Sequence, residues 1–288
     1  MARRAAALAD DVVAEGVVRI VCPNPGPMTL QGTNVYFVGE GPTRIMVDAG
    51  QECDGYRDAL VGARDRLGIQ RVQCVLITHR HHDHVGAVRL VRDVFGNNTP
   101  VLKHLADKTE QLPIDDIDRL CDGQVIESTC GRYRLSCIYA PGHTSDHMCF
   151  ALTPGNILFS GDCILGGDST AVFDDLTRYM ESLMALAARE PAFQVICPGH
   201  GSIVHNPRVK IQHYIEHRLA RDRQILDSLS GNGALSCDDI QRIIYGDTSG
   251  QLQSAARLVL QQHLRRLVHL GNLCENGPDL YSLPTDSQ

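Results

Sequence analysis

The chain has 288 residues, of which 43% are hydrophobic and 21% are charged, the composition of an ordinary globular protein and not of a disordered one. The formal net charge is -7, so any nucleic-acid function must come from a local patch or from metal ions. Trp is absent and aromatic residues make up 5%, which argues against base-stacking platforms for RNA. The apolar runs are much shorter than the roughly 18 residues of a membrane span, so we expect no membrane partner.

The eleven cysteines are scattered and form no Cys-x-x-Cys pair. Cys74, Cys149 and Cys197 lie in apolar strand-like runs, where a thiol packs as a small hydrophobic group. We therefore expect neither a disulfide framework nor a thiolate zinc site, and a reducing compartment fits this cysteine usage. The first residues, Met1 to Leu8, resemble an Arg-containing, Ala-rich transit segment, although acidic residues follow at once.

Residues 1–206 are predicted to form one domain of mixed strands and helices. Short apolar runs bounded by Gly, Pro, Asn and Asp predict strands, and helical periodicity appears between some of them. Because the two kinds of element mix without regular alternation, we expect an α+β fold with sheets between helical layers. The expected strands are Val17–Cys22, Thr33–Val38, Arg44–Val47, Val72–Thr78, Arg134–Ala140, Asn156–Phe159 and Gln194–Cys197, and the expected helices are Gly55–Leu67, Ala87–Phe95 and Leu176–Ala188.

Residues 207–288 are predicted to form a helical module with the outline of a winged helix. Ser236 offers an N-cap for its short second helix. The module holds nine basic and nine acidic residues, so we expect it to cover the cleft or to mediate a homodimer, and not to capture nucleic acid. The expected elements are helices over Val209–Ser228, Asp238–Tyr245 and Leu252–Leu270, the last with an apolar stripe of Leu258, Leu260, Leu264 and Leu267, and a hairpin around Asn276-Gly277.

The most informative stretch is a histidine cluster directly after a buried strand. The run Val75-Leu-Ile-Thr-His79-Arg-His81-His82-Asp83-His84 holds four His and one Asp within six positions. Imidazoles this close would repel each other on protonation, so the pattern indicates a cation. His79 and His81 are two residues apart and can point the same way from an extended segment to bind one metal. Asp83 and His84, one turn further, are placed for a second metal nearby.

Four further candidates each follow an apolar strand. Strand ends that meet at one sheet edge are a natural place to assemble a site from distant positions. Imidazole and carboxylate ligands suit two Zn²⁺ ions, and the same ligand types are compatible with Mn²⁺ or Fe. The candidates are Asp48 after Arg44-Ile-Met-Val, His143 after Ile138-Tyr-Ala-Pro-Gly, Asp162 after Ile157-Leu-Phe-Ser-Gly, and His200 after Val195-Ile-Cys-Pro-Gly.

These motifs, in this order, resemble those of the metallo-β-lactamase superfamily over the region from about Val17 to His205. The resemblance implies a four-layer αββα sandwich with the metals at one edge of two sheets, followed here by the winged-helix-like module. The domain of residues 1–206 would then be the catalytic domain. By position, the resemblance implies a first zinc ion held by His79, His81 and His143, a second held by Asp83, His84 and His200, and Asp162 as a bridge between them.

Asp48, Asp83 and His147 are the candidates for catalytic roles. Asp48 matches a position of the family that does not bind metal, and we expect it to hold the ligand loop by hydrogen bonds. His147, four residues beyond His143, is interpreted as a proton donor, as a support for a ligand, or as a purely structural residue. His82 is expected to be a loop residue, and Cys163 a packed thiol.

Finer motifs are similar to those of the β-lactamase-like protein 2 group of this superfamily. They are the runs from Asn24 to Asn34, Pro141 to Met148 and Phe159 to Gly166. That group is associated with endoribonuclease activity on single-stranded RNA in the mitochondrial matrix. The resemblance therefore implies a zinc-dependent endoribonuclease of that compartment, in which a hydroxide held between two metals attacks the phosphodiester.

Three alternatives stay open. Related fungal enzymes that share the Thr29–Asn34 type of segment are thioesterases that release polyketides from acyl carrier protein, so a thioesterase is the alternative activity. A non-catalytic zinc-binding interaction protein is the third interpretation, and it would require a lost ligand. The cytoplasm is the alternative location.

RNA binding by this acidic chain would depend on the metals and on a few basic side chains, such as Lys103, Lys108 or Lys210. Residues before Pro207 carry eighteen Lys and Arg against twenty-five Asp and Glu. We therefore expect weak, sequence-tolerant binding of single-stranded RNA. Arg80 stands where the group often has an aromatic residue, a departure that bears on substrate choice.

Overall fold

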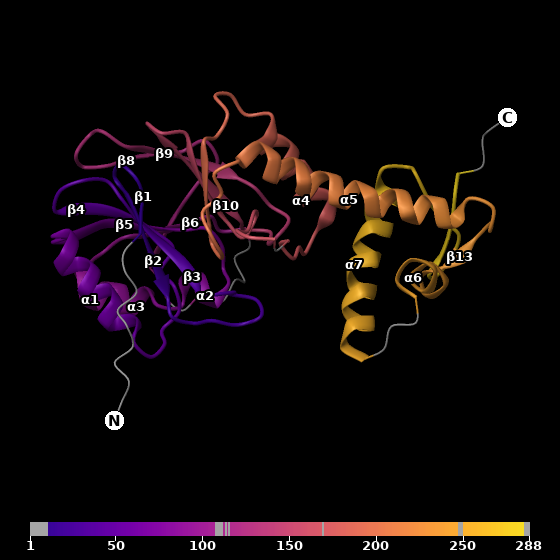
Figure 1. Ribbon diagram of the computed structural model, residues 1–288, viewed down its shortest axis with the longest axis horizontal. Helices are drawn as coiled ribbons and strands as arrows, with labels where there is room; N and C mark the ends of the chain where they lie inside the picture. The colour runs from indigo at the N-terminus through magenta and orange to yellow at the C-terminus, as the bar shows by residue number, and fades with distance from the viewer. Residues whose placement is uncertain are drawn as a thin grey trace.

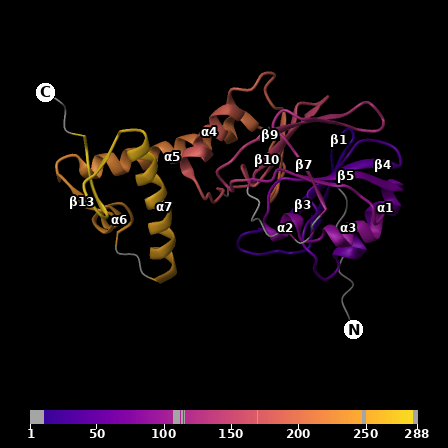
Figure 2. The ribbon, with the colours of Figure 1, turned by 180° about the vertical axis from the view of Figure 1, so that it is seen from behind.

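The computed structural model of the protein describes residues 11–106, 112, 114, 116–168, 170–246 and 250–284. The transit segment expected within the first residues and the side chain of Lys108 lie outside this part of the chain. Figures 1 and 2 show, from opposite sides, strands and helices stacked at one end of the molecule and the C-terminal helices at the other. The long helix α5, Pro207–Leu229, joins the two parts.

The first sheet has seven strands, within the described residues, that follow one another in chain order. The strands from β1 to β4 are antiparallel, and those from β4 to β7 run parallel. Parallel neighbours need a crossover connection, and α1 and α3 lie in the first two crossovers. The elements are β1 (Asp11–Ala14), β2 (Val17–Cys22), β3 (Thr33–Val38), β4 (Thr43–Val47), α1 (Tyr56–Leu67), β5 (Arg71–Ile77), α2 (His82–Val85), α3 (Val88–Phe95), β6 (Val101–Lys103) and β7 (Ile117–Arg119).

The second sheet has five strands in the order β12-β11-β10-β9-β8. Its pairs are antiparallel except β11 and β12, which are parallel and connected through α4. Asp175 caps α4, because its carboxylate accepts a hydrogen bond from the backbone N–H of Arg178 at 3.1 Å. The elements are β8 (Val125–Glu127), β9 (Arg134–Tyr139), β10 (Met148–Thr153), β11 (Ile157–Gly161), α4 (Leu176–Ala187) and β12 (Val195–Pro198).

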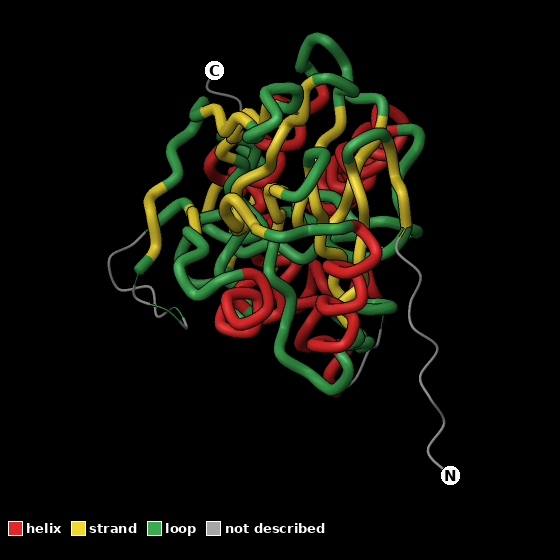
Figure 3. The backbone as a smooth tube through the Cα atoms, turned by 90° about the vertical axis from the view of Figure 1, so that its left-hand side faces the viewer, coloured by secondary structure: helices red, strands yellow, loops and turns green. Residues whose placement is uncertain are grey.

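The two sheets pack face to face, with helices on the outer faces. Side chains alternate along β3, so that Phe37 belongs to the core shared with α1 and α3, while Tyr36 belongs to the core between the sheets. On the far side, Leu158 and Ile196 of the second sheet pack with Leu183 of α4. Figure 3 shows the strands between layers of helix. The four-layer αββα sandwich predicted from the sequence is therefore confirmed.

The C-terminal residues follow the predicted order of helices and a hairpin. Ser236 caps α6 in a capping box with Asp239. Leu260, Leu264 and Leu267 of α7 are buried as predicted, whereas Leu258 is 66% exposed, so its place in the apolar stripe was wrong. The elements are α5, β13 (Leu235–Ser236), α6 (Cys237–Tyr245), α7 (Gly250–His269), β14 (Cys274–Glu275) and β15 (Leu280–Ser282), and the three strands pair in the order β13-β15-β14.

Helix α5 belongs to two hydrophobic cores. Ile211 and Ile215, in its first half, pack with α4 in the outer core of the sandwich. Ile225 and Leu229, in its last turns, pack with α6 and α7. The α5 helix therefore ties the C-terminal helices to the sandwich, and the domain boundary after residue 206 stays a prediction.

Several strands escaped the sequence prediction for a physical reason. The strands β6, β7 and β8 have three residues each, which is too short to show a period of two. Their neighbours in the sheet define them, and not their own pattern.

No helix in the described part of the chain is both long and apolar enough to cross a membrane.

Candidate metal centre

All the ligand candidates lie where strands of the two sheets end. The ends of β5, β9, β11 and β12 meet at one edge of the sandwich, because the sheets pack face to face. The loops that follow them are short, which keeps each side chain close to the edge. The residues and the strands they follow are His79, His81, Asp83 and His84 after β5, His143 after β9, Asp162 after β11, and His200 after β12.

Both Pro-Gly-His turns need their glycine, for different reasons. Gly142 has φ +131°, and a Cβ there would lie 2.3 Å from the backbone of Tyr179. A Cβ at Gly199 would lie 2.3 Å from Oδ1 of Asp162. Glycine thus allows His143 and His200 to approach the other ligand candidates.

The first group of ligand candidates is His79, His81, His143 and Asp162, whose ligand atoms lie within 4.8 Å of one another. Nε2 of His79 lies 2.9 Å from Nδ1 of His81, and Nε2 of His143 lies 3.3 Å and 3.1 Å from these two atoms. Nitrogens at the corners of a zinc tetrahedron are roughly 3.3 to 3.4 Å apart, given Zn–N bonds of about 2.0 to 2.1 Å. The three imidazoles therefore fit a single cation.

The second group is Asp83, His84 and His200, whose ligand atoms also lie within 4.8 Å of one another. Nε2 of His84 lies 3.3 Å from Nε2 of His200, and Oδ2 of Asp83 lies 3.3 Å and 3.0 Å from these two nitrogens. This set of two imidazoles and one carboxylate suits a divalent metal.

Asp162 lies between the two groups. Its Oδ2 is 3.7 Å from Nε2 of His143 and 3.3 Å from Nε2 of His200, and its Oδ1 is 3.4 Å from Nε2 of His84. Oδ1 is buried and has no hydrogen-bond partner within the described structure. A buried carboxylate oxygen without a donor is costly, and a cation would satisfy it. The residues present therefore fit a two-metal site.

In the metal-free chain, His79 and His81 of the first group differ in protonation from His84 and His200 of the second. Burial lowers the pKa of His79 and of His81, and the neighbouring imidazoles lower it further. Burial also acts to lower the pKa of His84 and His200, but the surrounding carboxylates outweigh it and raise the pKa of His200 to about 9. Metal binding at the second group is consequently coupled to proton release, whereas His79 and His81 of the first group present neutral imidazoles.

Asp48 orients imidazoles of both groups. Its Oδ2 lies 2.8 Å from Nδ1 of His84 and accepts a hydrogen bond from the Thr78 hydroxyl at 2.9 Å, while its Oδ1 accepts from the Thr78 N–H at 2.8 Å. The Thr78 hydroxyl lies 3.0 Å from Nδ1 of His79. With Nδ1 of both rings donating, Nε2 of His79 and His84 keeps its lone pair for a metal. The sequence had indicated Asp48 but not Thr78.

Other ligand candidates are held in the same way by residues that sequence analysis missed. Nδ1 of His143 donates to the carbonyl of Val172 at 2.7 Å, and Nδ1 of His200 to the carbonyl of Gly32 at 3.2 Å. The hydroxyl of Thr33 donates to Oδ2 of Asp83 at 3.2 Å. Asn24 in turn donates to that hydroxyl at 3.0 Å. The run from Asn24 to Asn34, noted only as a resemblance, thus supports the second group.

His147, His82 and Cys163 lie outside the two ligand groups. His147 is fully buried, and its Nε2 accepts a hydrogen bond from the backbone N–H of Asp162 at 3.2 Å. Burial lowers the pKa of His147 to about 3, so the ring is neutral at physiological pH. His82 is exposed and Cys163 is fully buried. His147 therefore contacts the backbone of Asp162, and its role stays a prediction.

A small cavity of about 80 Å³ opens onto the metal centre beside His143 and Asp162. Apolar side chains form much of its wall, and two of them, Met28 and Val172, are 66% and 55% exposed. These two exposed apolar side chains are candidates for contact with a bound ligand.

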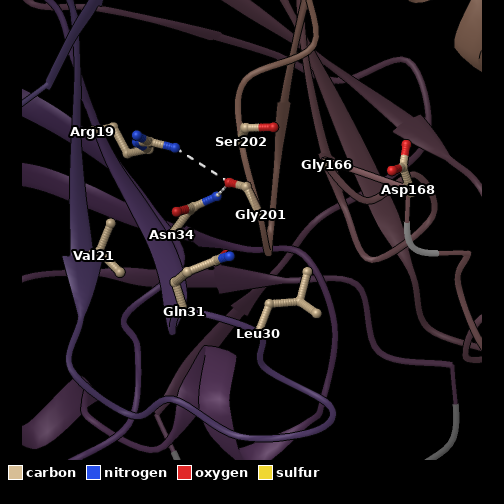
Figure 4. Close-up of a pocket in the computed structure, with 10 residues that line it drawn as sticks. Arg19, Val21, Leu30, Gln31, Asn34, Gly166, Asp168, Gly201 and Ser202 are labelled. Carbon is tan, nitrogen blue, oxygen red and sulfur yellow. Dashed lines mark hydrogen bonds between the residues drawn. The ribbon is translucent and has the colours of Figure 1, made fainter.

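A larger pocket of about 370 Å³, lined in part by Gly201 and Ser202, is shown in Figure 4. Arg19 and Asn34 point to the same atom from one side of it, because Nη1 of Arg19 and Nδ2 of Asn34 donate to the carbonyl of Gly201 at 3.2 Å and 2.9 Å. Nδ2 of Asn34 also donates to the carbonyl of Pro198 at 2.9 Å. These hydrogen bonds hold the turn that carries His200.

The prediction that Lys103 contacts RNA was wrong. Lys103 is fully buried, and its ammonium lies 2.6 Å from Oδ2 of Asp146. Burial alone would raise the pKa of Asp146, but the Lys103 ammonium outweighs it and the pKa is lowered. Arg80 lies 3.2 Å from Asp146 on the other side. Lys210 is partly exposed and donates to the carbonyl of Gly167 at 2.5 Å.

Comparisons with known proteins agree with this geometry. Residues 28–200 match the model of the metallo-β-lactamase superfamily. The chain is 37% identical over 270 residues to a β-lactamase-like protein 2 homolog of Drosophila melanogaster, covering 91% of this chain and 90% of the relative. It is 33% identical over 253 residues to an atrochrysone carboxyl ACP thioesterase of Aspergillus fumigatus, covering 82% and 75%. A metallo-β-lactamase family protein from Thermus thermophilus superposes with a TM-score of 0.72 at 21% identity, covering 94% of this chain and all of the other.

Proposed function

The chain belongs to the metallo-β-lactamase superfamily, and from this premise we propose that it is a two-zinc hydrolase that cleaves single-stranded RNA. The observation that carries the hydrolase is the convergence of seven imidazole and carboxylate side chains in two groups that meet at Asp162, whose Oδ1 is buried and has no hydrogen-bond partner within the described structure. The choice of RNA is supported by the similarity, over nine tenths of the chain, to β-lactamase-like protein 2 homologs. The choice of RNA therefore rests on the endoribonuclease activity that the resemblance of the sequence motifs to that group implies.

Each group of ligand candidates would hold one metal ion. The first ion would be held by His79, His81 and His143, and the second by Asp83, His84 and His200, with Asp162 between them. Two such ions would supply Lewis acidity, an activated water molecule near neutral pH and positive charge opposite a developing oxyanion.

The protein's own residues position the groups and limit what can enter. Asp162 links the two groups, so its carboxylate sets the distance between them. Asp48 and Thr78 hold the imidazole rings that face the metals. The cavity of about 80 Å³ beside His143 and Asp162 is small, and a flexible strand can bend a phosphate into it more readily than a duplex can. We therefore expect single-stranded RNA to be cleaved and duplex RNA to resist.

The test is a set of parallel assays with labelled single-stranded RNA, duplex RNA and acyl thioesters. Elemental analysis of the same sample, covering zinc, manganese and iron, should find two metals per chain. Asp162→Asn should lower the rate of RNA cleavage at least ~10²-fold, in line with the electrostatic contribution of metals in such sites. Asp58→Asn, in the exposed first turn of α1, removes the same charge away from the site and should not change the rate.

Cleavage that survives chelation, or that persists undiminished in Asp162→Asn, would reveal a contaminating ribonuclease and end the RNA proposal. A chain that binds no metal after zinc supplementation would remove the basis for hydrolysis altogether.

A thioesterase is the second candidate, and the exposed apolar side chains beside the metal centre favour it. Met28 and Val172 could cover an acyl chain beside the metals, and the Aspergillus fumigatus relative is a thioesterase by name. This function predicts that Met28→Ala lowers kcat/KM for long acyl thioesters more than for acetyl thioesters. Equal losses for both substrates would contradict a role of Met28 in acyl binding.

We also propose that the protein acts in the mitochondrial matrix, as the resemblance to the β-lactamase-like protein 2 group implies. A C-terminal fluorescent fusion of the full chain, imaged together with a matrix marker, tests this location. Uniform cytoplasmic fluorescence would contradict it.

A further inference from the structure

Residues 170–175, called here the rim segment, border the metal centre on the side of the C-terminal helices. The carbonyl of Val172, in this segment, accepts a hydrogen bond from Nδ1 of His143 at 2.7 Å. An imidazole that donates at Nδ1 keeps the lone pair of Nε2, and Nε2 of His143 faces His79 and His81. The position of the Val172 carbonyl therefore sets the direction in which His143 can bind a cation.

A buried guanidinium of α5 holds the rim segment on both sides of Val172. Arg218 is 6% exposed, and its Nη2 donates to the carbonyl of Ala171 at 2.9 Å. Its guanidinium carbon lies 4.7 Å from the centre of the Phe173 ring, within the distance of a cation–π contact. Arginine is rarely buried to this extent without partners. Its contacts with the residues before and after Val172 explain its place in this helix.

Helix α7 holds the other end of the rim segment. Nε2 of Gln262 donates to the carbonyl of Asp174 at 2.8 Å. The carboxylate of Asp174 pairs with Arg80 of the histidine cluster at 3.0 Å. The backbone N–H of Asp174 donates to the carbonyl of Gly142, the residue before His143, at 2.8 Å. The rim segment is thus anchored to the C-terminal helices and to two loops that carry ligand candidates.

We propose that Arg218 and Gln262 are positioning residues of the metal centre, which set the ligand His143 through the rim segment. The C-terminal helices then take part in metal binding from outside the ligand set. Loss of either side chain loosens the peptides around Val172, and the hydrogen bond that aligns His143 weakens with them. The inference rests on the metal site of the proposed function, and it is independent of whether the substrate is RNA or a thioester.

The test uses the full chain with four substitutions. Arg218→Met keeps much of the volume but removes the donors, Arg218→Lys restores a charge, and Gln262→Ala removes one hydrogen bond at a partly exposed position. Gln212→Ala is the matched control, because Gln212 is exposed on α5 and donates to Glu216 of the same helix at 2.8 Å. Zinc dissociation constants are measured by competition with a chromophoric chelator, and the metal-free chains are unfolded in urea to measure stability separately.

We expect Arg218→Met to raise the zinc dissociation constant of the site that contains His143 by about 10- to 100-fold, the range for residues that orient metal ligands. The dissociation constant of the other site should stay within threefold of the wild-type value. Gln262→Ala should weaken the same site less, Arg218→Lys should recover part of the loss, and Gln212→Ala should change nothing. In the Co²⁺-substituted protein, the absorption bands of the affected site should shift in Arg218→Met and not in the control.

The inference is overturned if wild-type protein binds two zinc ions and both Arg218→Met and Gln262→Ala bind them with unchanged affinities and unchanged Co²⁺ spectra. It is also overturned if both sites weaken equally, in proportion to a loss of stability of the metal-free chain. If Arg218→Met does not fold, Gln262→Ala against Gln212→Ala decides. A wild-type chain without metal would instead refute the proposed function.

Discussion

Asp48→Asn isolates the polarity of the hydrogen bonds that orient the metal ligands. Asp48 is 2% exposed and has φ +59°, a left-handed conformation that Asn tolerates as well as Asp does. The substitution is nearly isosteric, so neither strain nor a cavity should contribute to its effect. The substitution replaces one carboxylate oxygen, which accepts hydrogen bonds, by an amide NH2 group, which can only donate them.

The expected consequence follows from the three donors around this carboxylate. The backbone N–H of Thr78 cannot become an acceptor, so the new carbonyl oxygen must stay opposite it. The amide then faces Nδ1 of His84 and the Thr78 hydroxyl, both of which would have to accept. His84 would move its proton to Nε2, the atom that should face the metal, and His79 would follow through Thr78.

Loss of an orienting partner of a ligand histidine typically costs about 10- to 100-fold in metal affinity, roughly 1.4 to 2.7 kcal/mol. We expect a loss of this size in zinc affinity, measured by chelator competition. The loss of hydrolytic rate should be smaller than in Asp162→Asn. Asp58→Asn serves again as the control. Unchanged zinc affinities in a folded Asp48→Asn protein would refute the argument about hydrogen-bond polarity.

Three further predictions concern other parts of the structure. Removal of metal by a chelator should lower the melting temperature measured by circular dichroism, and zinc should restore it, because an ion that binds only the folded chain stabilises it. Thr33→Val removes the hydroxyl that donates to Asp83, and it should weaken one zinc site about 10-fold in the competition assay, whereas Thr33→Ser should not. Lys103→Met removes the buried cation that pairs with Asp146 and leaves the more exposed Arg80 beside the carboxylate, and it should cost about 3 kcal/mol in urea unfolding of the metal-free chain at pH 7. The pKa of Asp146 is lowered in the folded state, so its contribution to stability is present above its unfolded pKa and is lost as the pH falls through its folded pKa. The difference in unfolding free energy between Lys103→Met and wild type should therefore shrink in acid.

The local part of the metal site could be predicted from the sequence. His79, His81, Asp83 and His84 lie within six positions, so their proximity follows from the chain itself. His143, Asp162 and His200 were found because each follows a recognisable apolar strand, and strand ends of stacked sheets meet at one edge. The same patterns of period two and period 3.6 also predicted the major helices and the layered sandwich.

Only the tertiary structure decided what surrounds these ligands. Thr33 and Asp83 are 50 positions apart, and Arg218 and Ala171 are 47 apart, so no local pattern links either pair. Lys103 looked like a solvent-exposed cation, yet the fold places it against Asp146, 43 positions away, in the protein interior. A side chain's hydrogen-bond partner depends on which loops the packed sheets and helices bring together. Periodicity in the sequence reports which face of an element is buried, and it carries no record of the element that covers that face.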